Sequence, residues 1–161
     1  MIGLLASAIV SVPVALAQPI PKKSREHIVL HTLAGDVELA LYPSVAPHTS
    51  AKMLELTRLG VFDGAHFFRI EDHFVAQLST AEDRSTPLTS VQKAALQPIP
   101  TEFSSLPHVR GVLSIPRKND DSDSAASSFS ILLGPAPHLD GKYTVFGEVV
   151  RGMGRWSAHC F

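Results

Sequence analysis

The sequence is poor in cysteine, with Cys160 the only one among 161 residues. A single cysteine excludes an intramolecular disulfide framework and any metal site built from several thiolates. We interpret Cys160 as an incidental thiol in the tail, with an intermolecular disulfide as the alternative. The chain also has a single asparagine, Asn119, which two aspartates follow, so it contains no acceptor sequence for N-glycosylation.

Neither sign of charge is in excess. The chain has 14 Lys and Arg against 15 Asp and Glu, a formal net charge of −1. This balance lacks the electrostatic footprint of a protein that binds nucleic acid or an anionic membrane. Hydrophobic residues make up 45% of the chain, which is enough for an ordinary core, and the length suits one domain.

Long hydrophobic runs are missing apart from the N-terminal segment. Residues 2–17 are apolar, but Pro13 interrupts them, and they are shorter than the ~20 residues that span a bilayer. Ala15-Leu16-Ala17 has the small-x-small pattern of a signal-peptide cleavage site, although no Lys or Arg stands near the start. We expect residues 1–17 to be a signal peptide, with an N-terminal anchor or neither as alternatives. Residues 18–27 read as a linker.

The first part of the remaining chain predicts a hairpin followed by a helix. Residues 28–32 and 36–42 are two strand-like runs, and the second alternates apolar with other side chains at period two. The short connection through Gly35-Asp36 suits a hairpin. A helix is predicted to begin at Ala46-Pro47 and to end near Gly60, because proline is tolerated in a first turn and glycine ends helices.

Strand character continues through most of the chain. Further strands are predicted within the segments 66–79, 111–115, 128–134 and 143–150. Residues 79–107 are expected to be mostly loop, with a short helical turn near 90–96. The loop 116–127 carries Asp120, Asp121 and Asp123 but lacks the glycine and distal glutamate of an EF-hand, so a solvated acidic loop is favoured over a calcium site. The expected class is a mainly antiparallel β barrel or closed sheet covered by one or two helices.

Two motifs connect this chain to a known family. The pattern F-x-R-x-x-x-x-F-x-x-Q occurs at Phe67, Arg69, Phe74 and Gln77, and LDGKYTVFG begins at Leu139. With GDVELALYPSVAPHT, HVRGVLSI and SSFSILLG in the expected order, residues 28–153 resemble the cyclophilin family of peptidyl-prolyl cis-trans isomerases. The sequence of these motifs is most similar to that of a divergent plant-type subgroup that enters the secretory pathway. The resemblance implies an eight-stranded antiparallel barrel with capping helices, and an outer groove that takes an X-Pro peptide.

The resemblance also implies residue roles and no cofactor or metal. Rotation about a prolyl bond makes no bond to the substrate, so a catalyst must bind the twisted transition state better than either planar isomer. Arg69 matches the catalytic arginine, whose guanidinium donates to the prolyl nitrogen or the adjacent carbonyl, and Gln77 is expected to orient it. The expected substrate-binding residues are Phe74, Val75, Gln77, Ser128, Ser130, Leu139 and Tyr143.

Departures from the family pattern leave an alternative open. Ser130 stands where the family places the phenylalanine of the pocket floor, and Ser128 replaces a glutamine of the groove. These changes motivate a proline-peptide binding module with little turnover, and a poorly folded fragment is a second alternative. His138 replaces the tryptophan that favours cyclosporin binding, so weak cyclosporin affinity is expected.

The end of the chain also departs from the pattern. The family continues beyond Gly152-Met153 to a last strand that pairs with the first. Residues 154–161 are an atypical tail, so we expect this strand to be missing and residues 28–32 to be an unpaired sheet edge, which is an aggregation liability. The expected protein is a monomer of the endoplasmic reticulum lumen or the secreted space, and its partners are X-Pro peptides or client proteins.

Overall fold

The computed structural model describes residues 20–116 and 127–155. The predicted leader, most of the acidic loop and most of the tail with Cys160 lie outside these ranges. In chain order the elements are β1 (His27–Thr32), β2 (Gly35–Leu41), α1 (Pro47–Arg58), β3 (Phe67–Glu71), β4 (Val75–Leu78), α2 (Ser90–Ala95), β5 (Val112–Ser114), β6 (Ser130–Leu132) and β7 (Val145–Arg151), with single 3₁₀ turns at Ala81–Asp83, Pro137–Leu139 and Met153–Arg155.

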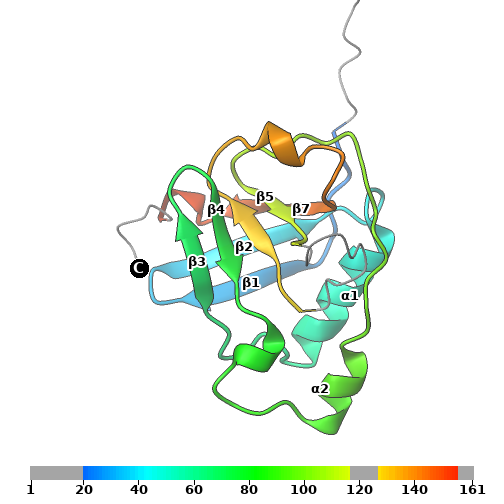
Figure 1. Ribbon diagram of the computed structural model, residues 1–161, viewed down its shortest axis with the longest axis vertical. Coiled ribbons are helices and arrows are strands. Elements are labelled where there is room, and N and C mark those ends of the chain that lie inside the picture. The colour runs from blue at the N-terminus through cyan, green and yellow to red at the C-terminus, as the bar shows by residue number, and fades with distance from the viewer. Residues whose placement is uncertain (1–19, 117–126, 156–161) are drawn as a thin grey trace, which may run out of the picture.

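The strands form one antiparallel sheet in the order β1-β2-β7-β5-β6-β4-β3. The sheet is strongly curled into a half-barrel, and α1 and α2 lie at one end of it (Figure 1). The prediction of a mainly β fold with helices is confirmed. The sequence predicted an eight-stranded barrel without its last strand, and the described residues form seven strands in an open, curled sheet whose two edges are β1 and β3.

The predicted hairpin and helix are both present, for the expected reasons. Gly35 has a φ of 107° at the β1–β2 turn, a backbone conformation that favours glycine. Helix α1 has Pro47 in its first turn, and Gly60, with a φ of 65°, follows its C-cap residue Leu59. The short helix α2 begins with a capping box in which Thr89 and Gln92 bond each other's backbone N–H groups.

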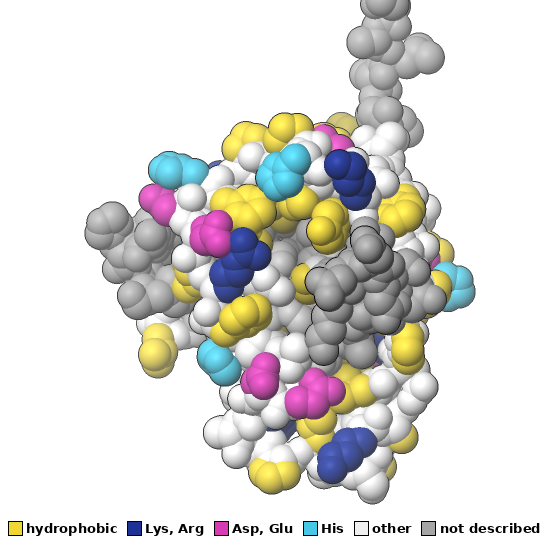
Figure 2. All heavy atoms as spheres, in the orientation of Figure 1, with side chains coloured by type: hydrophobic (Ala, Val, Ile, Leu, Met, Phe, Trp, Pro, Cys, Tyr) yellow, Lys and Arg dark blue, Asp and Glu magenta, His cyan; other side chains and the backbone are white. Residues whose placement is uncertain are grey.

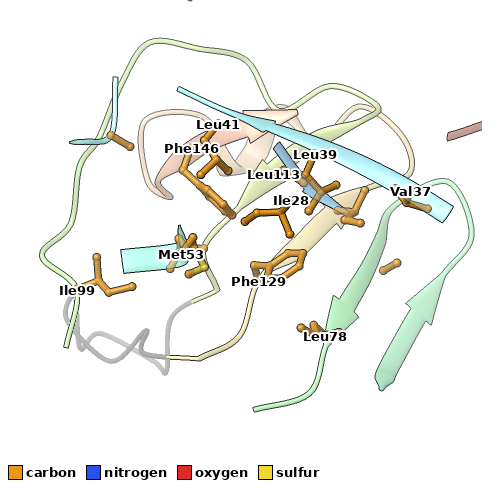
Figure 3. Packing of buried hydrophobic residues seen from close by; sticks show 14 of the residues in the cluster. Ile28, Val37, Leu39, Leu41, Met53, Leu78, Ile99, Leu113, Phe129 and Phe146 are labelled. Atoms are coloured by element: carbon orange, nitrogen blue, oxygen red, sulfur yellow. The ribbon is translucent and has the colours of Figure 1, made fainter. Parts of the chain in front are cut away.

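The core lies on the concave side of the curled sheet (Figure 3). Period-two alternation sends Leu39, Leu113 and Ile131 inward, and each is at most 1% exposed. Phe129 stands in edge-to-face contact with Phe146, at a centroid distance of 6.2 Å. Met53 of α1 closes the cluster from the helical end. The alternation therefore commits one face of β4, β6 and β5 to the core and leaves the other for function.

A cavity of about 270 Å³ lies beside the edge strand β1. Residues 28–32 form one wall, and Phe62, Phe67 and Phe129 contribute to the others. Within the described residues β1 hydrogen-bonds to β2 alone. This geometry agrees with the expectation of an unpaired edge at residues 28–32. The described residues include no helix long and apolar enough to cross a membrane.

Candidate functional site

A row of four polar side chains crosses four neighbouring strands on the convex side of the sheet. Arg69 on β3 stands opposite Gln77 on β4, and Gln77 stands opposite Ser130 on β6. Ser130 in turn stands opposite Ser114 on β5. Directly opposed residues of an antiparallel pair project to the same face, so the four side chains share one face.

Alternation explains why this face is polar while its neighbours are apolar. Ala76 and Ile131 adjoin Gln77 and Ser130 in sequence, and both point into the core. Val75 and Leu132 lie on the same face as the polar row, where they give it an apolar floor at one end. The period-two pattern therefore produces a mixed surface that can hold both an apolar ring and a polar backbone.

This row lies in a groove of about 390 Å³. The groove is lined by Phe68, Arg69, Phe74, Val75, Gln77, Ser114, Ile115, Pro116, Ser130, Leu132, Leu139 and Tyr143. Figure 2 shows hydrophobic side chains gathered around a hollow on this face, with basic and acidic side chains interspersed. The structure thus brings together Arg69 and six of the seven residues expected to bind substrate.

Ser128 is the exception, because it is not among the residues that line the groove. Its hydroxyl donates a 2.6 Å hydrogen bond to the Leu78 carbonyl, and the residue is 8% exposed. The strand β6 begins only at Ser130, so the alternation that places Ser130 in the groove does not extend back to Ser128. Ser128 joins β4 to the segment before β6 instead of lining the groove.

Arg69 reaches over the mouth of the groove and is held by two neighbours. Its Nε donates to Glu71 Oε1 at 2.8 Å, and its guanidinium carbon lies 5.5 Å from the centre of the Phe74 ring. The side chain is 44% exposed, which leaves donors available at the surface. Gln77 was expected to orient Arg69, but the orienting hydrogen bond in this structure comes from Glu71.

The hairpin of residues 67–78, which carries Arg69 and Phe74, is fastened to the loop after β6. Leu133 N donates to Phe74 O at 2.9 Å. Gly134 passes so close to the His73 carbonyl that a Cβ at this position would collide with it. The turn itself places His73 at a φ of 59°, and Phe74 N donates to Glu71 O at 3.1 Å. These contacts fix the height of the Phe74 ring above the groove.

Asp140 and His108 form a second polar cluster behind Ser114, the residue of the row on β5. Asp140 Oδ1 accepts from the backbone N of His108 at 2.7 Å and lies 2.9 Å from its Nδ1. His108 Nε2 lies 3.1 Å from Ser114 Oγ. His108 is fully enclosed, at 1% exposure. The His108 backbone N–H, followed by its ring, holds the pKa of the Asp140 carboxyl below its usual range, although partial burial opposes this.

This ordered relay determines which atoms carry protons. An ionised carboxylate can only accept, so Nδ1 of His108 is the protonated nitrogen facing Asp140. Nε2 of His108 faces the Ser114 hydroxyl at 3.1 Å. A serine oxygen has two lone pairs, so in either direction of that hydrogen bond the Ser114 oxygen keeps a lone pair that can accept from a ligand in the groove.

A family model described as cyclophilin type peptidyl-prolyl cis-trans isomerase matches residues 27–155. The chain belongs to this family. Peptidyl-prolyl cis-trans isomerase CYP23 of Arabidopsis thaliana is 46% identical over 154 residues, a match that covers 94% of this chain and 67% of the relative. A probable peptidyl-prolyl cis-trans isomerase of Brucella suis is 34% identical over 158 residues and is covered over 80% of its length. Isomerase activity is the function that this homology supports.

Solved cyclophilins share the fold. A cyclophilin from Hirschia baltica has a TM-score of 0.68 at 20% identity, and the match covers 80% of this chain and 65% of that one. A Cryptosporidium parvum cyclophilin, crystallised in the presence of the dipeptide Ala-Pro, has a TM-score of 0.66 at 20% identity and is covered over 82% of its length. At these identities the likeness concerns the fold alone.

Sequence reasoning missed Glu71, His108, Ser114 and Asp140 of this cyclophilin site, and also the apolar lining residues Phe68, Ile115 and Leu132. A signal existed for two of the polar residues, because Glu71 lies two residues from Arg69 on the same strand face, and Ser114 has the parity of a groove residue in GVLSI. His108 and Asp140 are 32 residues apart and carry no local signal. No cluster of three or more metal-binding side chains occurs in the described parts of the chain.

Proposed function

We propose that this cyclophilin accelerates rotation about X-Pro bonds in peptides seated in the groove, with Arg69 as the catalytic residue. The observation that carries the proposal is the position of an exposed guanidinium directly beside an apolar pocket formed by Phe74, Leu132 and Leu139. The pocket holds the proline ring, and the guanidinium meets the amide that twists.

The chemistry requires little more than these two parts. Amide resonance gives the prolyl bond a barrier of roughly 18–20 kcal/mol. Twisting localises the lone pair on the prolyl nitrogen and removes that resonance. Arg69 then stabilises the twisted state with its N–H donors, and its fixed planar fork and permanent charge suit this task. Gln77, opposite Arg69 in register, lies where its amide can bond the substrate backbone.

The test is exchange NMR of an Ala-Pro peptide with wild type, Arg69→Ala and Arg69→Lys. We expect Arg69→Ala to lower kcat/KM by about 10²-fold or more, the effect of losing a transition-state donor. Arg69→Lys should recover only part of this loss, because a lysine keeps the charge without the fork. Arg58→Ala removes an arginine that pairs with Glu26 away from the groove, and this control should leave kcat/KM unchanged. Equal rates for wild type and Arg69→Ala would refute the assignment.

The second candidate function is a proline-peptide binding module with little turnover. Two observations favour it: a small side chain, Ser130, lies in the pocket, and Glu71 already occupies donors of Arg69. Titration of the same peptide separates the two functions. Binding without accelerated exchange would favour the module, whereas acceleration that depends on Arg69 would exclude it.

We also infer that the chain is directed to the secretory pathway, where it assists the folding of client proteins. The support is the sequence of residues 1–17, which combines an apolar stretch with Ala15-Leu16-Ala17. Expression of the full chain with a C-terminal reporter in eukaryotic cells tests this inference. A reporter that stays in the cytosol would contradict it. N-terminal sequencing of the imported product would distinguish cleavage after Ala17 from an anchor.

A further inference from the structure

We propose that the pocket selects a proline ring that carries a hydroxyl group, so that X-(4-hydroxyproline) bonds are preferred over X-Pro bonds. The inference rests on the proposed function, since it assigns the substrate class of the same groove. It is carried by two buried serines, Ser114 and Ser130, that line the groove together with the apolar side chains of Phe74, Leu132 and Leu139.

The two serines are neighbours in the groove. Ser114 and Ser130 stand directly opposite each other on β5 and β6, and both line the groove. They are only 3% and 7% exposed, so their hydroxyls are reached through the groove. Around them, Phe74, Leu132 and Leu139 present apolar surface. A five-membered ring that packs against those side chains shares the groove with the two serines.

Ser130 has no hydrogen-bond partner within the part of the chain that the structure describes, although the residue is almost fully buried. A plain proline ring lying over Ser130 would remove water from this hydroxyl and offer nothing in return, which is unfavourable. A ring hydroxyl would restore the lost hydrogen bond.

Ser114 supplies the complementary half. Asp140 faces Nδ1 of His108, whose Nε2 lies 3.1 Å from Ser114 Oγ, and the Ser114 oxygen keeps a lone pair for the groove in either direction of that hydrogen bond. Ser130 is free to donate. A ring hydroxyl both donates and accepts, so it can donate a hydrogen bond to the Ser114 oxygen and accept one from the Ser130 hydroxyl. This pairing matches the substrate hydroxyl in both roles.

The two serines discriminate between the rings, because a plain proline ring offers their hydroxyls no hydrogen-bond partner. A site built to bond a substrate hydroxyl rejects the analogue without it, because the polar groups of the site then lose water without a partner. An apolar side chain at this place has the opposite effect. It makes favourable contact with the plain proline ring, and it removes water from a ring hydroxyl without offering a hydrogen bond. Replacement of Ser130 by phenylalanine should therefore reverse the preference.

The experiment compares three peptides that differ only at the residue after alanine: proline, (4R)-4-hydroxyproline and (4R)-4-fluoroproline. Exchange NMR and titration give kcat/KM and Kd for each. We expect the hydroxyproline peptide to exceed the proline peptide in kcat/KM by about fivefold or more, the factor that one net hydrogen bond supplies. The fluoro peptide has the polar substituent without an O–H donor, so it should behave like proline.

Three variants and one control locate the effect. Ser130→Ala and Ser114→Ala should each lower the hydroxyproline-to-proline ratio, and Ser130→Phe should bring it below one. Ser114→Ala leaves His108 Nε2 unpartnered and can reduce stability, whereas Ser130→Ala disturbs no hydrogen bond of the described residues. Ser50→Ala is the matched control, because this buried serine of α1 has no partner and lies outside the groove.

The outcomes separate this inference from the proposed function. Acceleration of the proline peptide with an equal or smaller effect on the hydroxyproline peptide overturns the inference and leaves isomerase activity standing. A preference that survives both Ser114→Ala and Ser130→Ala also overturns it. If none of the peptides binds or is accelerated, the proposed function itself fails.

Discussion

The guanidinium of Arg69 is bonded to the carboxylate of Glu71, with 2.8 Å from Nε and 2.6 Å from Nη2 to the same oxygen. The two residues are neighbours on one face of β3, because residues two apart on a strand project to the same side. Glu71 thus fixes the orientation of the Arg69 guanidinium. It also offsets the positive charge that would stabilise the twisted amide. The Glu71 carboxylate therefore competes with substrate for the N–H donors of Arg69.

Glu71→Gln is expected to raise kcat/KM by about twofold to fivefold, because an exposed ion pair is worth ~0.2–1 kcal/mol and its loss frees Arg69 donors for substrate. The dependence of the rate on salt should weaken in parallel. Exchange NMR of an Ala-Pro peptide at two ionic strengths measures both effects. Glu55→Gln, which breaks the pair with Lys52 on α1, is the control. A lower rate in Glu71→Gln would show that orientation by the carboxylate outweighs competition.

The Asp140–His108 contact makes part of the stability dependent on pH. The folded-state pKa of Asp140 is lowered, so its contribution is fully present above the unfolded pKa, near 3.9, and is lost as pH falls through the lower folded value. Asp140→Asn should reduce the free energy of unfolding near neutral pH by about 1 kcal/mol. Urea denaturation between about pH 7 and pH 3 measures the difference, which should shrink toward the acid end. A difference that stays constant over this range would contradict the assignment.

Phe146 is expected to be a core position that is highly sensitive to truncation. It is 1% exposed and packs edge-to-face against Phe129, which in turn packs against Phe62 at 5.8 Å. Phe146→Ala should destabilise the fold by roughly 3–5 kcal/mol through lost burial and a residual cavity. Denaturant unfolding followed by fluorescence or circular dichroism measures this. Val91→Ala, at a 63% exposed site on α2, should change stability by less than about 0.5 kcal/mol.

Cyclosporin affinity is expected to be weak and to depend on His138. This exposed side chain lies beside the Phe74 ring, with centroids 5.5 Å apart and planes tilted by 35°. His138→Trp restores the residue that favours the drug in the family, and we expect tighter binding by up to about tenfold from the larger aromatic contact. Calorimetric titration measures both affinities. Nanomolar binding by the wild type would overturn the expectation.

Local signals in the sequence were sufficient for most elements. Pro47 and Gly60 predicted the limits of α1. Runs of aliphatic and aromatic residues, with period-two alternation at residues 36–42, predicted the seven strands, because both signals are properties of short segments. The F-x-R-x-x-x-x-F-x-x-Q spacing placed Arg69, Phe74 and Gln77 on one hairpin, and all three line the groove. Their roles in binding and catalysis remain predictions that the experiments above test.

Other features depend on partners distant in the chain. Ser128 has the parity of Ser130, but the chain reaches strand geometry only at Ser130, and Ser128 bonds Leu78 instead. The relay from Asp140 to Ser114 passes through His108, and no local pattern connects the three. The order of strands in the sheet also depends on pairing between distant segments, such as β2 with β7, which alternation within one strand does not determine.

The contact between Gly134 and the His73 carbonyl has a consequence for how activity can be lost. A Cβ at position 134 would collide with the His73 carbonyl oxygen, so a substitution there forces the turn at His73 or the chain at position 134 to shift. Phe74 follows His73 directly and accepts from Leu133 N, so the shift would reach a residue that lines the groove. We therefore expect substitutions of Gly134, which does not line the groove, to lower activity while every lining residue stays the same.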